Sequence, residues 1–483
     1  MSDAARPLIS LNAPLLLRRL DLDWATAALC ASLVVSRLVA LACFPVFDDA
    51  FITFRYARNL AEGHGYLYNA GDWVLGTTAP LFGLIASLIA ALGGAPELVL
   101  PPVNIVLDLG IALLARALMF QGDRRGFACF IACFALSPML ARVSVGAMEV
   151  DLFVLCGLGA FALYQRQRVF LSIALGAAAY FLRPEAVLIV AVLCLGEMFL
   201  ARRPWRAMAM GALALAVVVP GLVTMQLVYG HFLSQSVLAK SAHVATPPLS
   251  VLRQLLAPEP ISGAIAIIGL AGVVMAFRKG GIARLLGGWL LIYLAAYMLG
   301  GPKIWSWYGF MPLTLTAIFA GAALSALSAR WRLRHLDWAV AAAVVAGWAV
   351  LGLWRYPDRI TRNIYEPVAS ACAATNASDT ILASDIGIIG YRCPGFIEDA
   401  AALVWPPAKN YATEWEIVSA TRPSYLFLNV TGSMLQHMSS EPLASAYHPV
   451  ERFAADGNRD PGAARNRGAD WAQEYILYRR VGE

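Results

Sequence analysis

Charged side chains are scarce in this chain of 483 residues: Asp, Glu, Lys and Arg make up 14% of it, against 59% hydrophobic residues. A soluble globular protein carries roughly 25% charged residues, so the composition argues against a soluble enzyme. The apolar content excludes a disordered chain, and eight cysteines are too few for a disulfide-dense secreted scaffold. No basic tract, RNP-like motif or zinc-finger spacing is present, so we expect no nucleic-acid partner. The composition therefore predicts a polytopic α-helical membrane protein.

The few charges divide the chain into two parts. Residues 1–355 contain 26 Lys and Arg and 16 Asp and Glu, a net charge of +10. Residues 356–483 contain 11 and 15, a net charge of −4. We therefore expect a transmembrane domain over residues 1–355. The more polar residues 356–483 are long enough for one small soluble domain.

Twelve apolar windows approach the length of about 20 residues that a membrane-spanning helix needs. They lie near residues 24–46, 79–93, 98–119, 127–143, 150–164, 169–182, 186–200, 206–229, 260–277, 284–300, 310–329 and 337–354. Several windows are short, and 79–93 is the weakest. The expected number of transmembrane helices is therefore about 11–13.

Basic residues gather in the loops on one side of these windows, which should be cytoplasmic. Those loops contain Arg18/Arg19, Arg124/Arg125, Arg166/Arg168, Arg202/Arg203/Arg206, Arg278/Lys279/Arg284 and Arg330/Arg332/Arg334. The loops of the other side are acidic or aromatic, and residues 356–483 follow on that side. For a bacterial inner membrane this orientation places the C-terminal domain in the periplasm.

The loop of residues 47–80 follows the first window on the outer side. Apolar and aromatic residues recur at helical spacing over residues 50–62, which predicts a helix lying along the membrane interface. Asp48 and Asp49 precede this helix. Two adjacent carboxylates at a low-dielectric boundary repel each other, which raises one pKa and favours a general base. The alternative is a pair of helix-capping residues.

The loop contains the segments Asp48-Asp49-Ala50-Phe51-Ile52, Arg55-Tyr56-Ala57, Asn59-Leu60-Ala61, Gly63-His64-Gly65 and Tyr68-Asn69. In these segments the chain resembles the GT-C glycosyltransferases that use lipid-linked sugars, and within them the AftB-like terminal arabinofuranosyltransferases. Weaker similarity continues through Ala147-Met148-Glu149, Arg183-Pro184-Glu185, Tyr229 to Lys240 and Asp385 to Tyr391.

The resemblance implies an enzyme that moves a sugar from a polyprenyl-phosphate donor to an acceptor hydroxyl. The sugar would be arabinofuranose, and the acceptor a cell-envelope glycan, a glycolipid or a protein. The catalytic carboxylate would lie in the first outer loop, at Asp48 or Asp49, with Asp48 slightly favoured.

Such a reaction needs positive charge at the donor phosphate. Our candidates are Lys240, Arg183, Arg55 and Arg58. Each has a simpler alternative: Lys240 at lipid headgroups, Arg55 and Arg58 on the polar face of the interfacial helix, and Arg183 in a plain loop. Arg37 and Asp108 stand inside apolar windows, where we expect them to pair within the bundle.

The predicted contacts to sugar or donor use hydroxyl-binding and aromatic side chains. They are Tyr56, His64, Glu149, Glu185, His243, Trp307 and Tyr308. The alternatives are a helix-terminal charge for Glu149, a membrane-interface belt for the aromatics and a turn residue for His64. Asp48, Asp49 and Glu149 could hold a divalent cation, but no ligand spacing requires one, and no other cofactor is indicated.

The C-terminal part reads as a small α/β domain. Strands are predicted over 380–383, 425–429 and 475–478, and helices over 361–376 and 415–421. Asp385 and Asp399 at strand ends could face the membrane site or only cap. In an oxidising compartment we expect Cys372 and Cys393 to form a disulfide.

Two other function classes fit a polytopic chain with an outer domain. One is a flippase or transporter for a polar lipid, and the other is a non-enzymatic assembly or sensor protein. Transporters often carry internal repeats with paired broken helices. We find no such repeat, and the outer carboxylates and basic residues favour the enzyme.

Overall fold

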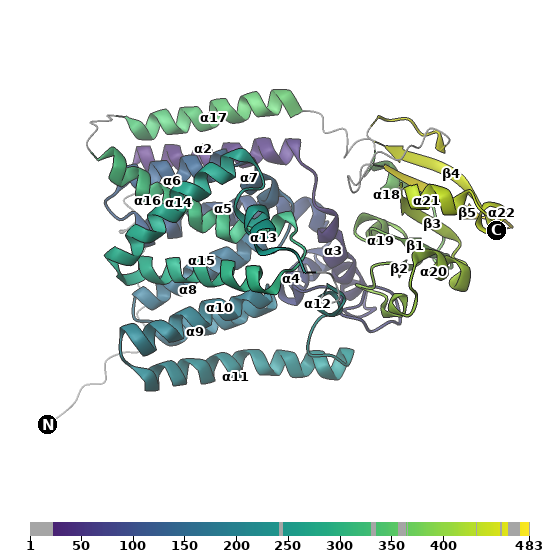
Figure 1. Cartoon of the computed structure of the whole chain (residues 1–483), viewed down its shortest axis with the longest axis horizontal. Coiled ribbons are helices and arrows are strands. Elements are labelled where there is room, and N and C mark those ends of the chain that lie inside the picture. Colours follow the sequence, from purple (N-terminus) through teal and green to yellow (C-terminus); the bar gives the residue numbers. More distant parts are fainter. Residues whose placement is uncertain are drawn as a thin grey trace.

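The computed structural model describes residues 23–240, 245–329, 335–355, 364, 366–430, 432–454, 456–461 and 474–482. It consists of a bundle of helices and a small α/β domain at one end of that bundle (Figure 1). This is the predicted fold class, a polytopic helical membrane protein with a small C-terminal domain. The last helix of the bundle ends at Arg355, the residue at which we divided the chain.

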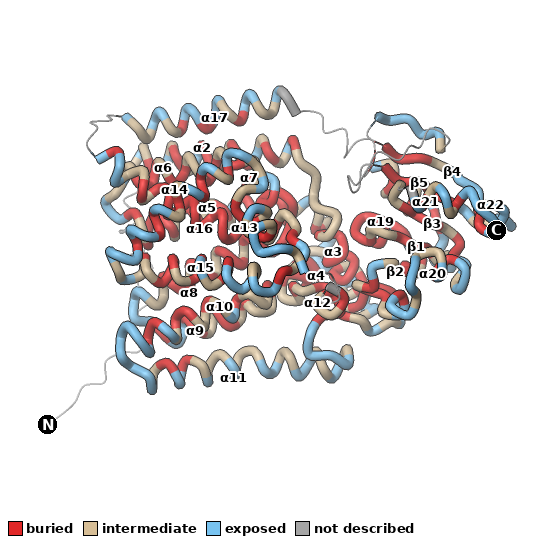
Figure 2. The backbone as a smooth tube through the Cα atoms, viewed as in Figure 1, coloured by how far each residue is buried: buried red, intermediate tan, exposed pale blue. Residues whose placement is uncertain are grey.

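Within the described residues, seven helical segments are long and apolar enough to cross a membrane. They are α2 (Trp24–Cys43), α5 (Pro96–Met119), α11 (Pro204–Tyr229), α14 (Pro260–Lys279), α15 (Gly281–Gly300), η4 with α16 (Ser306–Gly309 and Phe310–Ser328) and α17 (Leu336–Arg355). The η4–α16 segment is 72% buried and forms the centre, whereas α11 is only 11% buried (Figure 2). Since α11 is as apolar as the central helices, its exposed side chains are suited to lipid and not to water.

Shorter helices fill the remaining windows, and each of the twelve windows contains a helix. They are α4 (Pro80–Ala91), α8 (Val150–Gln165), α9 (Val169–Ala178) with η1 (Ala179–Phe181), and η2 (Pro184–Ala186) with α10 (Val187–Leu195) and η3 (Gly196–Leu200). The weakest window, 79–93, holds only the twelve residues of α4, too few for a straight crossing.

The window 127–143 is not one helix, contrary to our reading. It divides into α6 (Arg124–Leu136) and α7 (Pro138–Val145), which are bent by 68°. Ser137 accepts the Leu140 N–H as the N-cap of α7, and Pro138 occupies its first turn. A capping serine followed by proline is a start signal for a new helix, which explains the break.

Arg37 and Asp108 form the expected pair inside the bundle. The Arg37 Nε lies 2.6 Å from the Asp108 Oδ2, and neither side chain is exposed. Arg37 also donates to the Phe134 carbonyl, while Asn104 donates to Asp151 nearby. Four helices are joined by these contacts, because a charge in an apolar bundle is tolerated only with a partner.

The end of the bundle next to the C-terminal domain carries three shorter helices. These are α3 (Asp48–Ala61), α12 (Gln235–Lys240) and α13 (Pro248–Leu256). A helix is thus present where one was predicted over residues 50–62, and it starts two residues earlier, at Asp48. Its position along a membrane interface stays a prediction. In Figure 1, α3 stands between the bundle and the C-terminal domain.

The C-terminal domain is built on a five-stranded sheet with the order β2-β1-β3-β5-β4. The strands are β1 (Thr380–Ala383), β2 (Phe396–Asp399), β3 (Tyr425–Asn429), β4 (Tyr447–Ala454) and β5 (Glu474–Arg480). β1, β2 and β3 are parallel, and β5 and β4 continue the sheet antiparallel. Three strands match the prediction, and β2 and β4 were not predicted.

Short helices flank this sheet. They are α18 (Glu366–Ala373), α19 (Ile388–Arg392), η6 (Pro406–Asn410), α20 (Glu414–Thr421), α21 (Gly432–Met438) and α22 (Leu443–Ala446). Because β1, β2 and β3 are parallel, their carboxyl ends meet at one edge. That edge carries Asp385, Asp399 and Asn429.

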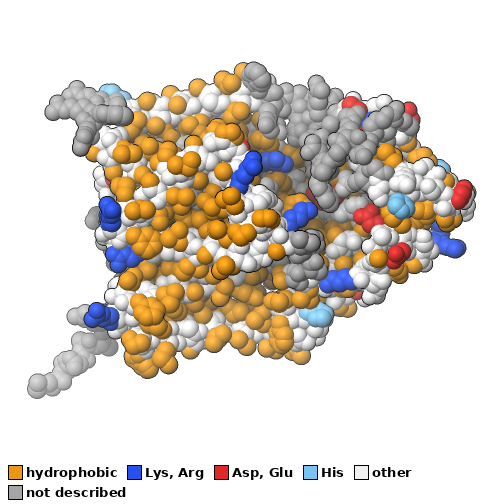
Figure 3. Space-filling view, viewed as in Figure 1, with side chains coloured by type: hydrophobic (Ala, Val, Ile, Leu, Met, Phe, Trp, Pro, Cys, Tyr) orange, Lys and Arg blue, Asp and Glu red, His pale blue; other side chains and the backbone are white. Residues whose placement is uncertain are grey.

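Basic and acidic side chains lie on different parts of the surface. Figure 3 shows Lys and Arg side chains at the end of the bundle opposite the C-terminal domain, an apolar face between, and Asp and Glu mainly on that domain. A few basic side chains also interrupt the apolar face near its border with the C-terminal domain. A wide apolar face between polar ends is the distribution that a membrane requires.

Candidate active site

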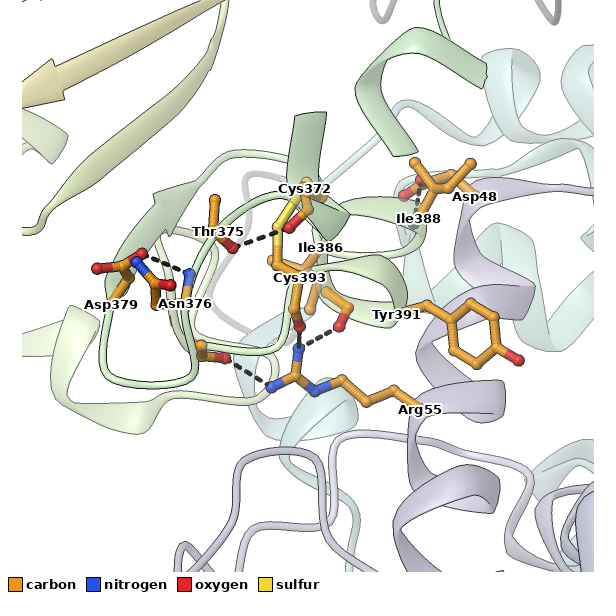
Figure 4. The surroundings of a disulfide bond; sticks show 12 residues. Asp48, Arg55, Cys372, Thr375, Asn376, Asp379, Ile386, Ile388, Tyr391 and Cys393 are labelled. Carbon is orange, nitrogen blue, oxygen red and sulfur yellow. Dashed lines mark hydrogen bonds between the residues drawn. A yellow bond between two sulfur atoms is a disulfide. The ribbon is translucent and has the colours of Figure 1, made fainter. Parts of the chain in front are cut away.

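Asp48 lies at the start of α3, where the chain has just left α2, and it bonds to the C-terminal domain. Its Oδ1 accepts the Ile388 N–H at 2.8 Å and its Oδ2 accepts the Gly387 N–H at 3.0 Å (Figure 4). A Cβ atom at position 387 would lie 1.9 Å from the Asp48 carbonyl oxygen, so only glycine allows this approach. One predicted catalytic carboxylate is therefore held by two backbone donors from a distant part of the chain.

The same surroundings decide the ionisation of Asp48. Burial and the negative charge of Asp385 raise the pKa of the Asp48 carboxyl to about 7, and Asp49 adds to the effect. The N–H groups of Gly387 and Ile388 oppose this rise. A carboxylate has about four lone-pair positions, so Asp48 can still accept a proton. A base with a pKa near neutrality is suited to proton transfer at neutral pH.

Arg55, a predicted phosphate ligand, is buried and donates to backbone carbonyls. Its guanidinium contacts the carbonyls of Gly390, Cys393 at 3.2 Å and Gly395 at 3.0 Å, and its Nε donates to the Tyr68 carbonyl at 2.7 Å (Figure 4). Each of these bonds uses donors that a phosphate would need. The contacts thus give Arg55 a structural role at the domain interface.

Arg58 also bonds helix α3 to the C-terminal domain. Its guanidinium donates to the Tyr391 carbonyl at 2.6 Å and lies over the Tyr391 ring. Helix α3 thus contacts the start of α19 through Asp48 and its end through Arg55 and Arg58. As phosphate ligands, both arginines stay predictions.

The expected disulfide joins Cys372 to Cys393, and this prediction is confirmed (Figure 4). It ties the end of α19 to α18, directly beside the carbonyls that Arg55 contacts. The six other cysteines lie in the helical bundle and are free thiols.

Three predicted residues meet in a second cluster, in which Glu149 comes from 34 positions before Arg183. Arg183 lies between Glu149 and Glu185, with an oxygen of each 2.7 Å from a guanidinium nitrogen. Tyr297 donates to Glu185, and Arg183 lies over the Tyr308 ring. The contact with Glu185 agrees with the expectation that this residue orients Arg183. Two carboxylates balance the single cation, which makes the cluster less suited to binding a phosphate than an arginine with one partner.

Aromatic rings connect this cluster to Asp48. Tyr308 contacts Trp307, with ring centroids 6.0 Å apart, and Trp307 contacts Phe47 at 5.6 Å. Phe47 directly precedes Asp48. Trp305 stacks on Trp307 with planes 2° apart, so the rings form one continuous aromatic surface.

Two basic residues border this aromatic surface. Arg142 of α7 lies 5.5 Å from the centroid of Phe47, and Lys303 lies 4.5 Å from that of Trp305; both are exposed. We missed Arg142 because the window 127–143 reads as a single span. The Ser137-Pro138 break was the signal that could have placed Arg142 near the first loop.

Tyr56 and His64 are not brought to either cluster. Tyr56 is fully buried and its hydroxyl bonds to Val74 and Gly76, which holds the first loop in shape. His64 is 56% exposed and lies beside Glu62.

Lys240 ends helix α12, which lies over the first loop. Gln235 donates its N–H to the Leu75 carbonyl at 2.7 Å, and its side chain donates to Ala402 of the C-terminal domain. The Lys240 side chain and His243 are outside the described residues. In the part of the chain that is described, no three His, Cys, Asp or Glu side chains form a group suited to a metal ion.

An apolar groove of about 530 Å³ opens between α2 and α17. Its lining consists of Val35, Leu38, Val39, Ala42, Cys43, Gly352 and Leu353. The groove reaches Cys43, the last residue of α2 and five positions before Asp48. It therefore extends to the end of α2 that precedes Asp48 in the chain.

No protein-family model and no curated protein sequence matches the chain. Solved structures do. The crystal structure of ArnT from Cupriavidus metallidurans in the apo state has a TM-score of 0.61 and 13% identity, over 94% of this chain and 97% of that one. The chain has the fold of ArnT.

Two further structures agree with this result. ArnT bound to undecaprenyl phosphate has a TM-score of 0.60, with 13% identity over 94% of this chain and 98% of that one. The Archaeoglobus fulgidus oligosaccharyltransferase tethered to an acceptor peptide has a TM-score of 0.51, with 13% identity over 90% of this chain and 74% of that one. The expected GT-C fold is thereby confirmed at the level of the fold.

Proposed function

We propose that this protein is a membrane glycosyltransferase that moves a sugar, arabinofuranose in our reading, from a polyprenyl-phosphate donor to an acceptor hydroxyl. The acceptor is a cell-envelope glycan, glycolipid or protein, at the periplasmic face of a bacterial inner membrane. The observation that carries the proposal is Asp48: a carboxyl group at the border of the bundle and the C-terminal domain, bonded by the Gly387 and Ile388 N–H groups, in a chain with the ArnT fold. The undecaprenyl phosphate bound by ArnT supports a lipid-linked donor.

In the proposed reaction a carboxylate of the Asp48-Asp49 pair takes the proton of the acceptor hydroxyl. The acceptor oxygen bonds to the anomeric carbon as the bond from that carbon to the phosphate oxygen breaks. The polyprenyl phosphate leaves with that electron pair. A well-placed general base contributes roughly 10²–10⁴-fold to such a step.

The remaining groups are assigned by their chemistry. Lys240 neutralises the phosphate, and Arg142 supplies a second cation at the Phe47 ring. Glu149 and Glu185, held by Arg183, accept sugar hydroxyls, and the Trp307–Tyr308 rings stack on the sugar. The apolar groove between α2 and α17 accommodates part of the prenyl chain, because it is lined by apolar side chains and reaches the end of α2 that precedes Asp48.

The test is a transfer assay with purified protein in detergent or proteoliposomes. It uses a panel of synthetic polyprenyl-phosphate sugars that includes the arabinofuranose, with mono- and oligosaccharide acceptors. Wild type is compared with Asp48→Asn and Asp49→Asn, and with Glu451→Gln as a control that removes one distant acidic charge. We expect one aspartate variant to lose roughly 10²-fold or more and the control to keep its activity.

Equal transfer by all four proteins would refute the assigned base. A parallel assay follows the movement of a labelled polyprenyl-phosphate sugar across vesicles. Movement without transfer from any donor would favour the polar-lipid flippase over the enzyme.

A further inference from the structure

The loop of residues 384–388 is the point where the C-terminal domain meets the candidate base. It follows β1 and leads into α19, and its Gly387 and Ile388 N–H groups bond to Asp48. On its other side the Ile386 carbonyl accepts the Tyr68 hydroxyl at 2.5 Å. The loop is therefore held between two residues of the first outer loop, and its placement determines where the Asp48 carboxylate points.

Asp385 is fixed inside this loop by two donors. The Asn429 side-chain amide lies 2.5 Å and the Tyr475 hydroxyl 2.8 Å from its Oδ2. These residues come from β3 and β5, so the core of the sheet holds Asp385 two positions before Gly387. The carboxylate is partly buried and lies close enough to act electrostatically on Asp48.

We infer that the 384–388 loop is a positioning element of the catalytic site. Its two N–H groups orient the Asp48 carboxylate, and the charge of Asp385 keeps that carboxylate able to accept a proton. The inference rests on the proposed function for its catalytic meaning. On this inference, the C-terminal domain orients the catalytic carboxylate of Asp48 across the domain interface.

The charges around Asp48 support this reading. Asp49 on its own helix and Asp385 on the loop both raise the pKa of Asp48, after the effect of burial. Tyr68 faces it from the first loop. Glu97 of α5, which also packs against this region, is bonded instead to Tyr391 and Arg392. Asp385 is thus the principal charge that the C-terminal domain presents to Asp48.

The test is the pH dependence of kcat/KM for transfer, from about pH 5 to about pH 9. The base works when ionised, so the wild-type rate falls on the acidic side of its pKa. Replacing Asp385 by Asn keeps an acceptor for Asn429 and Tyr475 but removes the charge. We expect the acidic side of the pH profile to move to lower pH by about one unit, the order of magnitude for the loss of one nearby like charge.

Two variants serve as controls. Asp385→Glu retains the charge, so the acidic side of its pH profile should lie at the same pH as in wild type. Glu451→Gln removes a carboxylate of the same domain that bonds only to Arg459 among the described contacts, and should leave the pH profile unchanged. An acidic side that stays in place in Asp385→Asn, or that moves to higher pH, would overturn the inference.

A second measurement does not depend on transfer. A folded-state pKa above the unfolded value of about 3.9 means that folding favours the proton, so stability from Asp48 is present at low pH and is lost as pH rises toward 7. Asp385→Asn should weaken this fall in the unfolding temperature, and should have no such effect in an Asp48→Asn background.

The two measurements separate the two proposals. In one outcome, the unfolding experiment shows that Asp385 affects Asp48 while no donor supports transfer. This result would refute the proposed function but would support the electrostatic interaction between Asp48 and Asp385. An identical pH dependence of unfolding in wild type and Asp385→Asn would overturn the link, whatever the transfer assay shows.

Discussion

Two buried carboxyl groups, those of Asp108 and Asp48, have opposite electrostatic surroundings. Inside the bundle, the Asp108 carboxylate meets a guanidinium at 2.6 Å and no side-chain surface is exposed. At the domain interface, Asp48 receives two backbone N–H groups and has other carboxylates as its charged neighbours. The first arrangement neutralises charge and joins helices. The second raises the pKa of a carboxyl group toward neutrality. Such a shift is typical of catalytic and binding sites and does not by itself stabilise the fold.

The largest expected effect concerns the buried pair. Replacing Asp108 by Leu leaves Arg37 without its partner, which should lower the free energy of unfolding by about 3–5 kcal/mol. Thermal unfolding in detergent measures this. The double variant Arg37→Met/Asp108→Leu should recover most of the loss, because it removes both members of the ion pair. A double variant as unstable as the single one would contradict the assignment.

Next in size is the disulfide at the interface. Replacing Cys372 and Cys393 by Ser opens a loop of 21 residues and should cost about 3 kcal/mol in the chain-entropy model. Unfolding of the intact protein with and without reductant gives the same comparison. Because the bond ties down α19, we also expect faster amide exchange at Gly387 and Ile388. Unchanged exchange there would separate the disulfide from the Asp48 site.

A smaller loss is expected for Arg55→Met. The change keeps much of the apolar stem but leaves buried carbonyls at the end of α19 without a donor, at a cost of about 1–3 kcal/mol. Hydrogen exchange should report it locally, in α19 and in residues 67–69. If Arg55 serves the donor phosphate instead, Arg55→Met will raise the donor KM while exchange in α19 stays as in wild type.

The smallest effect is expected at an exposed ion pair. Arg459 and Glu451 lie 2.7 Å apart, but the arginine side chain is 64% exposed. Since water competes with such a pair, Glu451→Gln should change the free energy of unfolding by only about 0.5 kcal/mol. A loss as large as that of Asp108→Leu would erase the contrast between buried and exposed charge on which these predictions depend.

Much of the architecture could be read from the chain because the information is local. Each of the twelve apolar windows contains a helix, and β1 and β3 begin and end where predicted. The helix at Asp48 and the Cys372–Cys393 pair were also foreseen. The prediction was wrong at Ser137, where a capping serine and a proline inside an apolar window end one helix and start another. The strands β2 and β4 were not predicted.

The candidate site was predicted as a set of separate residues, and only in part as an arrangement. Glu149, Arg183 and Glu185 were expected on the same side of the membrane, and they are in contact. Arg55 and Arg58 were expected at a phosphate, yet their guanidinium groups bond to carbonyls more than 330 positions away. No periodicity or spacing could reveal such partners.

The sequence by itself determined the solvent of this protein, its helical windows and the side on which its polar groups gather, since these follow from hydropathy and from the distribution of charge along the chain. Only the tertiary structure decided which carboxylate is bound by backbone donors, which arginines are already occupied and which charges face Asp48. A pKa depends on burial and on neighbours within a few ångströms, and those neighbours come from residues 385 to 388, far along the chain from Asp48.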